Sequence, residues 1–269
     1  MQISDLGEVE LLQRVTTPFQ HHIQQSSIVG IGDDAALLDL AAGAQLLTST
    51  ELLMEGIHFD LVYFPLKYLG FKSVTSAVSD IIACGGTPRQ LLLGLGLSQR
   101  FQVEDVETFM QGVHEALTLY QMDLIGADMT SSLTGFTISA TAIGTVGKDQ
   151  MIQRKSAEVN NLICLTGDIG AAYMGLQLLL REKVAYDGSE DFEPQFAGRE
   201  YILQRQLHPI ARFDILSELE KGGIRPTAMI DVTDGLASDL LQLCRASGVG
   251  CRIFEERLPI DYQTHAMAS

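Results

Sequence analysis

Carboxylate and hydroxyl side chains recur in this sequence where apolar segments end or glycines interrupt the chain. These are hard oxygen ligands of the kind that Mg²⁺ prefers, and Mg²⁺ is usually held by few carboxylates together with substrate phosphates. We therefore expect a magnesium site that supports phosphoryl transfer, a reaction that depends on positioning and charge neutralisation more than on a strong base. The oxygen-bearing set comprises Asp34, Ser49, Thr50, Glu51, Asp80, Asp128, Asp231, Thr233 and Asp234.

Taken one at a time, several of these residues also have an ordinary structural interpretation. Asp33 and Asp34 could form a turn in which the neighbouring glycines supply positive φ angles. Asp80 falls in the last turn of a predicted helix, where it opposes the macrodipole, yet it could simply be solvated. Asp234 is a natural N-cap for the helix that follows it. Capping does not explain Asp231, because both of its neighbours are apolar.

Hydrophobic periodicity predicts a first domain of mixed strands and helices over residues 1–148. Apolar residues at helical spacing predict three helices, and the strict alternation in 134–146 predicts a half-buried strand of the antiparallel type. Predicted helices cover 6–19, 65–84 and 103–120, and predicted strands cover 44–50, 91–97, 122–125 and 134–146.

Polar residues around 147–161 mark the predicted domain boundary, and a second, α/β domain is expected over 149–269. Its glycine turn, 166–170, leads from a strand into a helix and is either an ordinary turn or a cradle for an anion. Another short strand delivers Asp231, Thr233 and Asp234 to the start of a helix. Predicted strands cover 162–165 and 229–233, and predicted helices cover 171–181, 209–221 and 236–246.

Composition limits the possible partners. The chain has 18 basic and 34 acidic residues in 269, a formal net charge of −16, and its basic residues form no visible cluster. Direct charge pairing with nucleic acid or an anionic membrane is therefore not expected. Bound metal ions could still reverse the sign of an acidic site and admit phosphates. Four scattered cysteines and the absence of a signal peptide or apolar span favour a cytoplasmic protein.

Five acidic motifs, in this order and at these separations, resemble the thiamine-monophosphate kinase family. That family belongs to the superfamily of aminoimidazole ribonucleotide synthetase and selenophosphate synthetase. The His-Phe pair that follows Glu-Gly in the second motif favours this kinase over its cousins, and the likeness covers nearly the whole chain. The motifs are GIGDDAALL (30–38), STELLMEGIHF (49–59), SAVSDIIACGG (76–86), IGADMTSS (125–132) and MIDVTDGLASDL (229–240).

The resemblance implies ATP-dependent phosphorylation of thiamine phosphate to thiamine diphosphate, with several Mg²⁺ ions. Among the metal-binding positions, Asp34, Asp80, Asp128 and Asp231 would be catalytic. His58 would touch thiamine phosphate. Nucleotide-binding positions would be Ala127, Asp128, Arg154 and Thr233. Metal-binding positions would be Asp34, Ser49, Thr50, Glu51, Asp80, Asp128, Asp231 and Asp234.

The resemblance also implies a homodimer in which the N-terminal mixed sheets of two chains pair into a barrel. An α/β C-terminal domain would lie beside each sheet, and we expect it to be incomplete, because the family continues with a GGEDYE segment and a later aromatic residue. The chain departs from the family at Glu51 (usually Asp), Ala127 (usually Gly) and Thr233 (usually Ser). Two alternatives stay open: another ATP-dependent synthetase of the superfamily, and a nucleotide- and magnesium-binding module without turnover.

Overall fold

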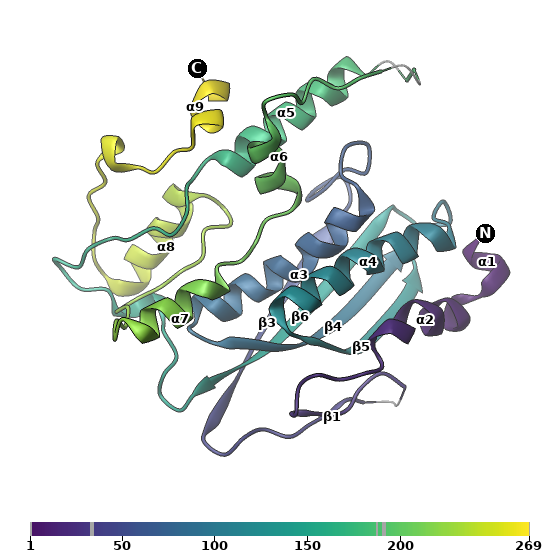
Figure 1. Cartoon of the computed structure of the whole chain (residues 1–269), viewed down its shortest axis with the longest axis horizontal. Coiled ribbons are helices and arrows are strands. Elements are labelled where there is room, and N and C mark those ends of the chain that lie inside the picture. The colour runs from purple at the N-terminus through teal and green to yellow at the C-terminus, as the bar shows by residue number, and fades with distance from the viewer. Residues whose placement is uncertain (1, 33–34, 187, 190–191, 269) are drawn as a thin grey trace. The chain divides into compact units, whose positions relative to one another are not determined.

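The computed structural model describes residues 2–32, 35–186, 188–189 and 192–268, so the predicted ligand Asp34 lies outside the described residues. The chain divides into two compact units, Met1–Met151 and Ile152–Ser269. Figure 1 shows the elements of both units, and each unit is described by itself. In the described part of the chain, no helix is long and apolar enough to cross a membrane.

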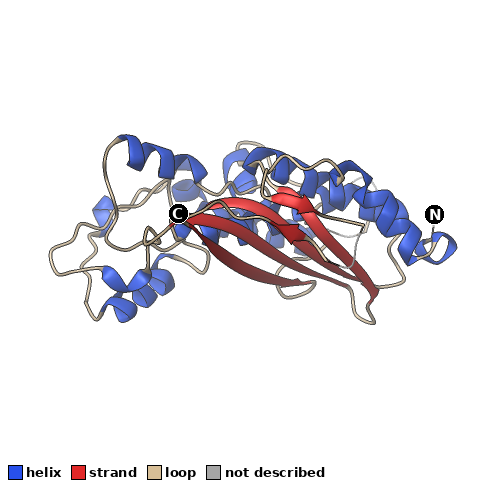
Figure 2. Cartoon of the chain, turned by 90° about the horizontal axis from the view of Figure 1, so that it is seen from below, coloured by secondary structure: helices blue, strands red, loops and turns tan. Residues whose placement is uncertain are grey.

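Unit 1 is built on a four-stranded mixed sheet of order β3-β6-β4-β5. Strand β6 is antiparallel to both of its neighbours, and β4 and β5 are parallel because helix α4 connects them as a crossover. Figure 2 shows the helices of this unit lying along one side of the sheet. The elements are β3 (Ala44–Met54), α3 (Leu66–Ala83), β4 (Thr87–Leu97), α4 (Val103–Tyr120), β5 (Asp123–Ser131) and β6 (Phe136–Gly147).

The core of unit 1 lies between this sheet and helices α3 and α4. Alternate residues of β4 are buried, from Leu91 to Leu97, as expected for a strand with one covered face. The two helices approach closely, since a Cβ atom added at Gly112 would lie 1.8 Å from the carbonyl oxygen of Lys67. Smaller elements complete the unit: α1 (Ile3–Leu6), α2 (Glu8–Thr16), η1 (Thr17–Phe19), β1 (Ser27–Val29) and β2 (Leu37–Leu38).

The opposite face of the sheet carries exposed apolar side chains. Leu46, Leu52 and Met54 alternate along β3 and are 48%, 56% and 41% exposed. Leu92 of β4 lies on the same face, because it pairs with Thr141, which in turn pairs with Thr50. This surface, defined by Leu46, Leu52, Met54 and Leu92, is called the open sheet face below.

Most predicted elements of unit 1 are confirmed, but three strands are longer than expected. Strand β4 begins at Thr87, four residues before the predicted start. Strand β3 continues to Met54, so Ser49, Thr50 and Glu51 lie inside it and not at its end. Strand β5 continues to Ser131, so Asp128 also lies inside a strand. The extensions of β3 and β5 follow from hydrogen-bonded neighbours: β3 pairs with β6 as far as Met54, and β5 pairs with β4 as far as Ser131.

Unit 2 is helical in its described residues. The predicted strands at 162–165 and 229–233 are wrong: these segments have no regular secondary structure and join no sheet, and Leu162 and Ile163 are 90% and 53% exposed. An apolar run forms a strand only where a neighbouring strand takes its backbone hydrogen bonds. The elements are η2 (Arg154–Ser156), α5 (Ala171–Ala185), α6 (Glu200–Leu207), α7 (Phe213–Lys221), α8 (Leu236–Ser247), η3 (Glu255–Arg257) and α9 (Tyr262–Ala268).

Candidate active site

In unit 1 the structure brings Ser49 and Asp80 together. The hydroxyl of Ser49, on β3, donates a hydrogen bond to Oδ2 of Asp80, near the C-terminal end of α3. Glu51 lies two residues further along β3 and therefore on the same face as Ser49. All three side chains are half-buried between the helix and the strand. A hydroxyl and two carboxylates thus gather on the helix-covered side of the sheet.

Thr50 lies on the other face of β3. Its hydroxyl is 2.9 Å from the hydroxyl of Thr141 on β6, and it belongs to the open sheet face. Ser49, Thr50 and Glu51 are consecutive in the sequence, but they do not form one cluster in space. Successive strand residues point to opposite sides, so Thr50 points away from Ser49 and Glu51.

Asp128 lies at the far edge of the sheet from these residues. It pairs with Gly94, which pairs with Ser139, which pairs with Leu52 of β3. Three strand spacings of about 4.8 Å separate β5 from β3, a distance on the order of 14 Å. Within one chain, Asp128 is therefore too far from Glu51 to share a metal ion with it.

The oxygen donors near Asp80 fit magnesium chemistry in type. They are hard carboxylate and hydroxyl ligands, and Mg²⁺ is bound by one or two carboxylates while phosphates and water fill the remaining positions. Among the described residues, no group of three or more His, Cys, Asp or Glu side chains is placed to hold a metal ion.

Lys72 lies on α3, two turns before Asp80. Burial lowers the pKa of its ammonium group to about 8, and its Nζ lies 5.3 Å from the ring centroid of Phe64. A desolvated ammonium group is stabilised in part by the negative face of an aromatic ring.

His58 follows β3 in a tight turn that fixes its imidazole ring. The backbone N–H of Met54 donates to Nδ1 of His58 at 3.0 Å, and the N–H of His58 donates to the carbonyl of Met54 at 2.9 Å. In the neutral ring the proton is then on Nε2, and the side chain is exposed. The turn thus presents one N–H donor to solvent, which suits an anionic oxygen.

Glu55, next to this turn, has a structural role that sequence reasoning missed. Its Oε1 is ion-paired with Arg100, and its Oε2 accepts the N–H of Phe136 at 2.9 Å. The guanidinium carbon of Arg100 lies 4.9 Å from the ring centroid of Phe101. Through its bond to Phe136, Glu55 therefore links the end of β3 to the start of β6, close to His58 in the chain. The sequence signal that could have identified Glu55 is its position in the second motif, 49–59.

In unit 2, the segment with Thr233 and Asp234 is organised by Asp239. One carboxylate oxygen of Asp239 accepts the N–H groups of Thr233, Asp234 and Gly235 at 3.1, 3.2 and 3.0 Å. Asp239 is buried, and Gly235 occupies the N-cap position of α8 without a side-chain cap. The alternative interpretation of Asp234 as the cap of this helix is wrong, because Gly235 is the N-cap residue and Asp239 accepts the N–H groups at the helix start. Asp234 remains exposed, and Asp231 is half-buried.

Arg154, the predicted nucleotide ligand, is held by the same helix. Its Nη1 donates to Oε1 of Gln242 at 3.2 Å, and its carbonyl accepts the hydroxyl of Ser247 at 2.6 Å. Both partners belong to α8. Unit 2 therefore connects Arg154 and the 231–235 segment through one helix.

The glycine turn at 166–170 carries an acid rather than an open cradle. Asp168 accepts a hydrogen bond from the hydroxyl of Tyr201, and burial together with that bond raises the pKa of Tyr201 to about 12. A carboxylate at this position repels an anion, so an ordinary strand-free turn before α5 is the better description.

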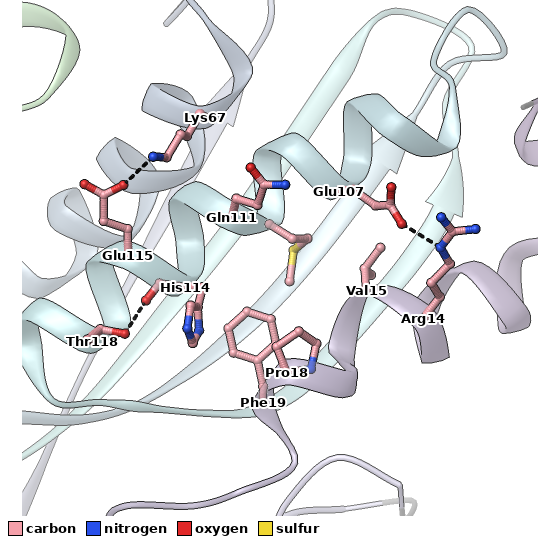
Figure 3. Close-up of a pocket in the computed structure, with 11 residues that line it drawn as sticks. Arg14, Val15, Pro18, Phe19, Lys67, Glu107, Gln111, His114, Glu115 and Thr118 are labelled. Carbon is pink, nitrogen blue, oxygen red and sulfur yellow. Dashed lines mark hydrogen bonds and ion pairs between the residues drawn. The ribbon is translucent and has the colours of Figure 1, made fainter.

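A cavity of about 800 Å³ lies elsewhere in unit 1, between α2, η1, α3 and α4 (Figure 3). Ion pairs Arg14–Glu107 (2.5 Å) and Lys67–Glu115 (2.9 Å) stand on its rim, and Phe19 contributes an apolar wall. Lys67 is thirteen positions from Asp80 along α3, about 20 Å of helix, and none of the predicted site residues lines the cavity.

Comparison with known proteins defines the class first. Residues 32–146 match the family described as AIR synthase related protein, N-terminal domain. A thiamine-monophosphate kinase of Bacillus subtilis (strain 168) is 34% identical over 257 residues, which are 95% of this chain and 75% of the relative. The chain belongs to the thiamine-monophosphate kinase family.

Solved structures agree with this assignment. A thiamine-monophosphate kinase from Stenotrophomonas maltophilia K279a is 29% identical with a TM-score of 0.79, covering 94% of this chain and 76% of that one. The structure described as AaThiL complexed with AMPPCP and TMP is 30% identical with a TM-score of 0.74, covering 100% of this chain and 79% of that one.

Proposed function

We propose that this protein transfers the γ-phosphoryl group of ATP to thiamine phosphate and so forms thiamine diphosphate, with Mg²⁺ as cofactor. The observation that carries the proposal is the meeting of Ser49 and Asp80, from two of the five family motifs, on one side of the sheet. Family membership and the AaThiL complex with AMPPCP and TMP support the choice of substrates.

On the helix-covered side of the sheet, Ser49, Glu51 and Asp80 are the proposed magnesium ligands. Thr50 and Asp128, on the open sheet face, and Asp34, Asp231 and Asp234 are proposed as further ligands. Bound Mg²⁺ would neutralise the phosphate charges and hold donor and acceptor in line. The acceptor is already an anionic phosphate oxygen, so no catalytic base is required.

The chain's own residues would position the two substrates. The Nε2–H of His58 donates to the phosphate of thiamine phosphate, because Nδ1 is already occupied by the Met54 N–H. Arg154 provides a direct cation for the nucleotide, and its orientation is maintained by Gln242. Ala127 and Thr233 lie along the nucleotide.

We propose that the active form is a homodimer whose sheets close into a barrel. The open sheet face exposes four large apolar side chains that a second copy would cover. Among the residues that the structure describes, no strand pairs with the outer edge of β3 or of β5. Pairing β5 of one chain with β3 of its partner would remove both edges. The same pairing would bring Asp128 of one chain near Thr50 of the other, because both lie on the open sheet face. A cytoplasmic location remains a prediction from composition.

The proposal is tested by measuring ADP release with ATP, Mg²⁺ and thiamine phosphate, with and without the acceptor. Asp80→Asn should lower turnover by about 100-fold or more, because a charged ligand to the phosphates is lost, while circular dichroism stays unchanged. Asp149→Asn, in an exposed turn with a φ of 58°, is the matched control and should keep full activity.

Other outcomes would identify the alternatives. ADP release that requires a different acceptor would make the protein another synthetase of the superfamily. Nucleotide binding without ADP release under any acceptor would make it a binding module. If Asp80→Asn and Asp149→Asn lose the same amount of ADP-release activity, Asp80 has no specific role in the site.

A further inference from the structure

The end of α8 brings together two cysteines that the proposed reaction does not use. The helix ends at Ser247, and Gly248 has a φ of 66°, a left-handed conformation that glycine adopts at little cost. The N–H of Val249 donates to the carbonyl of Cys244 at 3.0 Å, so the chain folds back over the last helical turn. The returning segment carries Cys251, whose thiol lies close enough to that of Cys244 to interact with it.

The two thiols differ in exposure. Cys251 is exposed, so an oxidant in solution reaches it first. Cys244 is buried, with 6% of its surface exposed, and burial raises the pKa of its thiol. Direct attack by Cys244 on a reagent in solution is therefore disfavoured. The buried thiol is instead placed to resolve an adduct formed at its neighbour.

We propose that Cys244 and Cys251 form a reversible intramolecular disulfide when the protein meets a small disulfide oxidant such as oxidised glutathione. The Cys251 thiolate attacks one sulfur of the oxidant, which releases one glutathione thiolate and leaves a mixed disulfide. The sulfur of Cys244 then attacks the sulfur of Cys251, gives its proton to solvent and displaces the second glutathione. Two protein thiols and one oxidised glutathione become one protein disulfide and two reduced glutathione molecules.

The disulfide would join the last turn of α8 to the segment that follows it. Because Gln242 and Ser247 in the same part of α8 hold Arg154, oxidation would restrain the helix end that supports this arginine. The chemistry itself depends only on the two thiols, so it can be tested whether or not the kinase proposal is correct.

The whole chain is incubated with oxidised glutathione, alkylated, digested with trypsin and analysed by mass spectrometry. Trypsin cuts after Arg245 and Arg252, so Cys244 and Cys251 fall in different peptides and a disulfide joins these two peptides. We expect the cross-linked peptide pair, a loss of two of the four titratable thiols, and full recovery with dithiothreitol.

Cys251→Ser should abolish the cross-link and leave Cys244 unmodified, because the accessible thiol is gone. Cys164→Ser, which removes another exposed cysteine, is the matched control and should keep the cross-link at the wild-type yield. A glutathione adduct that persists on Cys251, or a cross-link from Cys251 to Cys164, would overturn the proposal. Circular dichroism of each reduced variant establishes that it is folded.

Discussion

Asp239 shows how one buried side chain sets the conformation of a predicted ligand segment. Asp239→Ala should lower the free energy of unfolding by about 2 kcal/mol or more, since the N–H groups of Thr233, Asp234 and Gly235 lose a charged acceptor. Chemical denaturation of the two single variants Asp239→Ala and Asp234→Ala provides the comparison. Asp234 is exposed, so its variant should remain near wild type. Equal losses would return the capping role to Asp234.

Lys72 gives the protein a pH dependence that can be isolated. Its pKa of about 8 in the folded chain lies below the 10.5 of an ordinary lysine, so the unfolded chain binds more protons between these values. The free energy of unfolding should therefore rise as the pH is raised from about 8 to about 10.5. It should fall again when the pH is lowered through this range, because the buried amine regains its charge. Relative to Lys72→Met, the melting temperature of the wild type should be lower at pH 8 and should improve by pH 10.5. A difference that is the same at both pH values would contradict this account.

In each unit, two helices pack closely where one of them has a glycine at the contact. A Cβ added at Gly112 would lie 1.8 Å from the Lys67 carbonyl oxygen, and one added at Gly175 would lie 2.1 Å from that of Ile202. Gly112→Ala should therefore destabilise unit 1 by about 1–3 kcal/mol, because α3 and α4 must separate. Gln111→Ala, at the exposed neighbouring position, should change stability little in the same denaturation experiment. A Gly112→Ala variant as stable as Gln111→Ala would show that the helices can separate without cost.

Local signals predicted some elements well and others poorly. Helix α4 was predicted with its observed bounds, because its apolar spacing agrees with a capping box at Gln102 and Asp105. Strand β5 was predicted too short, since Asp128 and Thr130 point to an exposed side and resemble a loop in the sequence. The segments at 162–165 and 229–233 are apolar in the sequence, which favoured strands. The sequence did not show that neither segment has a neighbouring strand to pair with.

The same distinction applies to the site. The motifs identified oxygen-bearing residues because each has a local pattern of acids, hydroxyls and glycines. Which of them face one another depends on strand register and on helix packing, as the bond from Ser49 to Asp80 shows. The supporting roles of Glu55 and Asp239 were not predicted. Glu55 meets Arg100 and Phe136, which are distant in the sequence, only in the folded chain. Asp239 binds the backbone of 233–235, and a pattern of residue types does not show such hydrogen bonds.

For the whole molecule, the sheet order makes the position of Asp128 decisive. Strands β3 and β5 are at opposite edges of one sheet, on the order of 14 Å apart, so Asp128 can join Thr50, on the same open sheet face, only across two chains. In that arrangement each complete set of open-face ligands takes Thr50 from one chain and Asp128 from its partner. The proposed dimer and the proposed ligand set therefore depend on each other.

Mixing two inactive variants tests this dependence directly. Thr50→Val and Asp128→Asn proteins should each be inactive, but after they are unfolded together and refolded as a mixture, each heterodimer has one site with Thr50 and Asp128 both intact. If exchange is random and the dimer is symmetric, about a quarter of wild-type ADP release should return. Separately refolded variants, combined only in the assay, control for unexchanged protein, and gel filtration reports the dimer. Wild-type protein refolded by the same procedure must regain its activity. If wild-type dimers recover but the mixture stays inactive, Asp128 does not complete a site formed by the other chain.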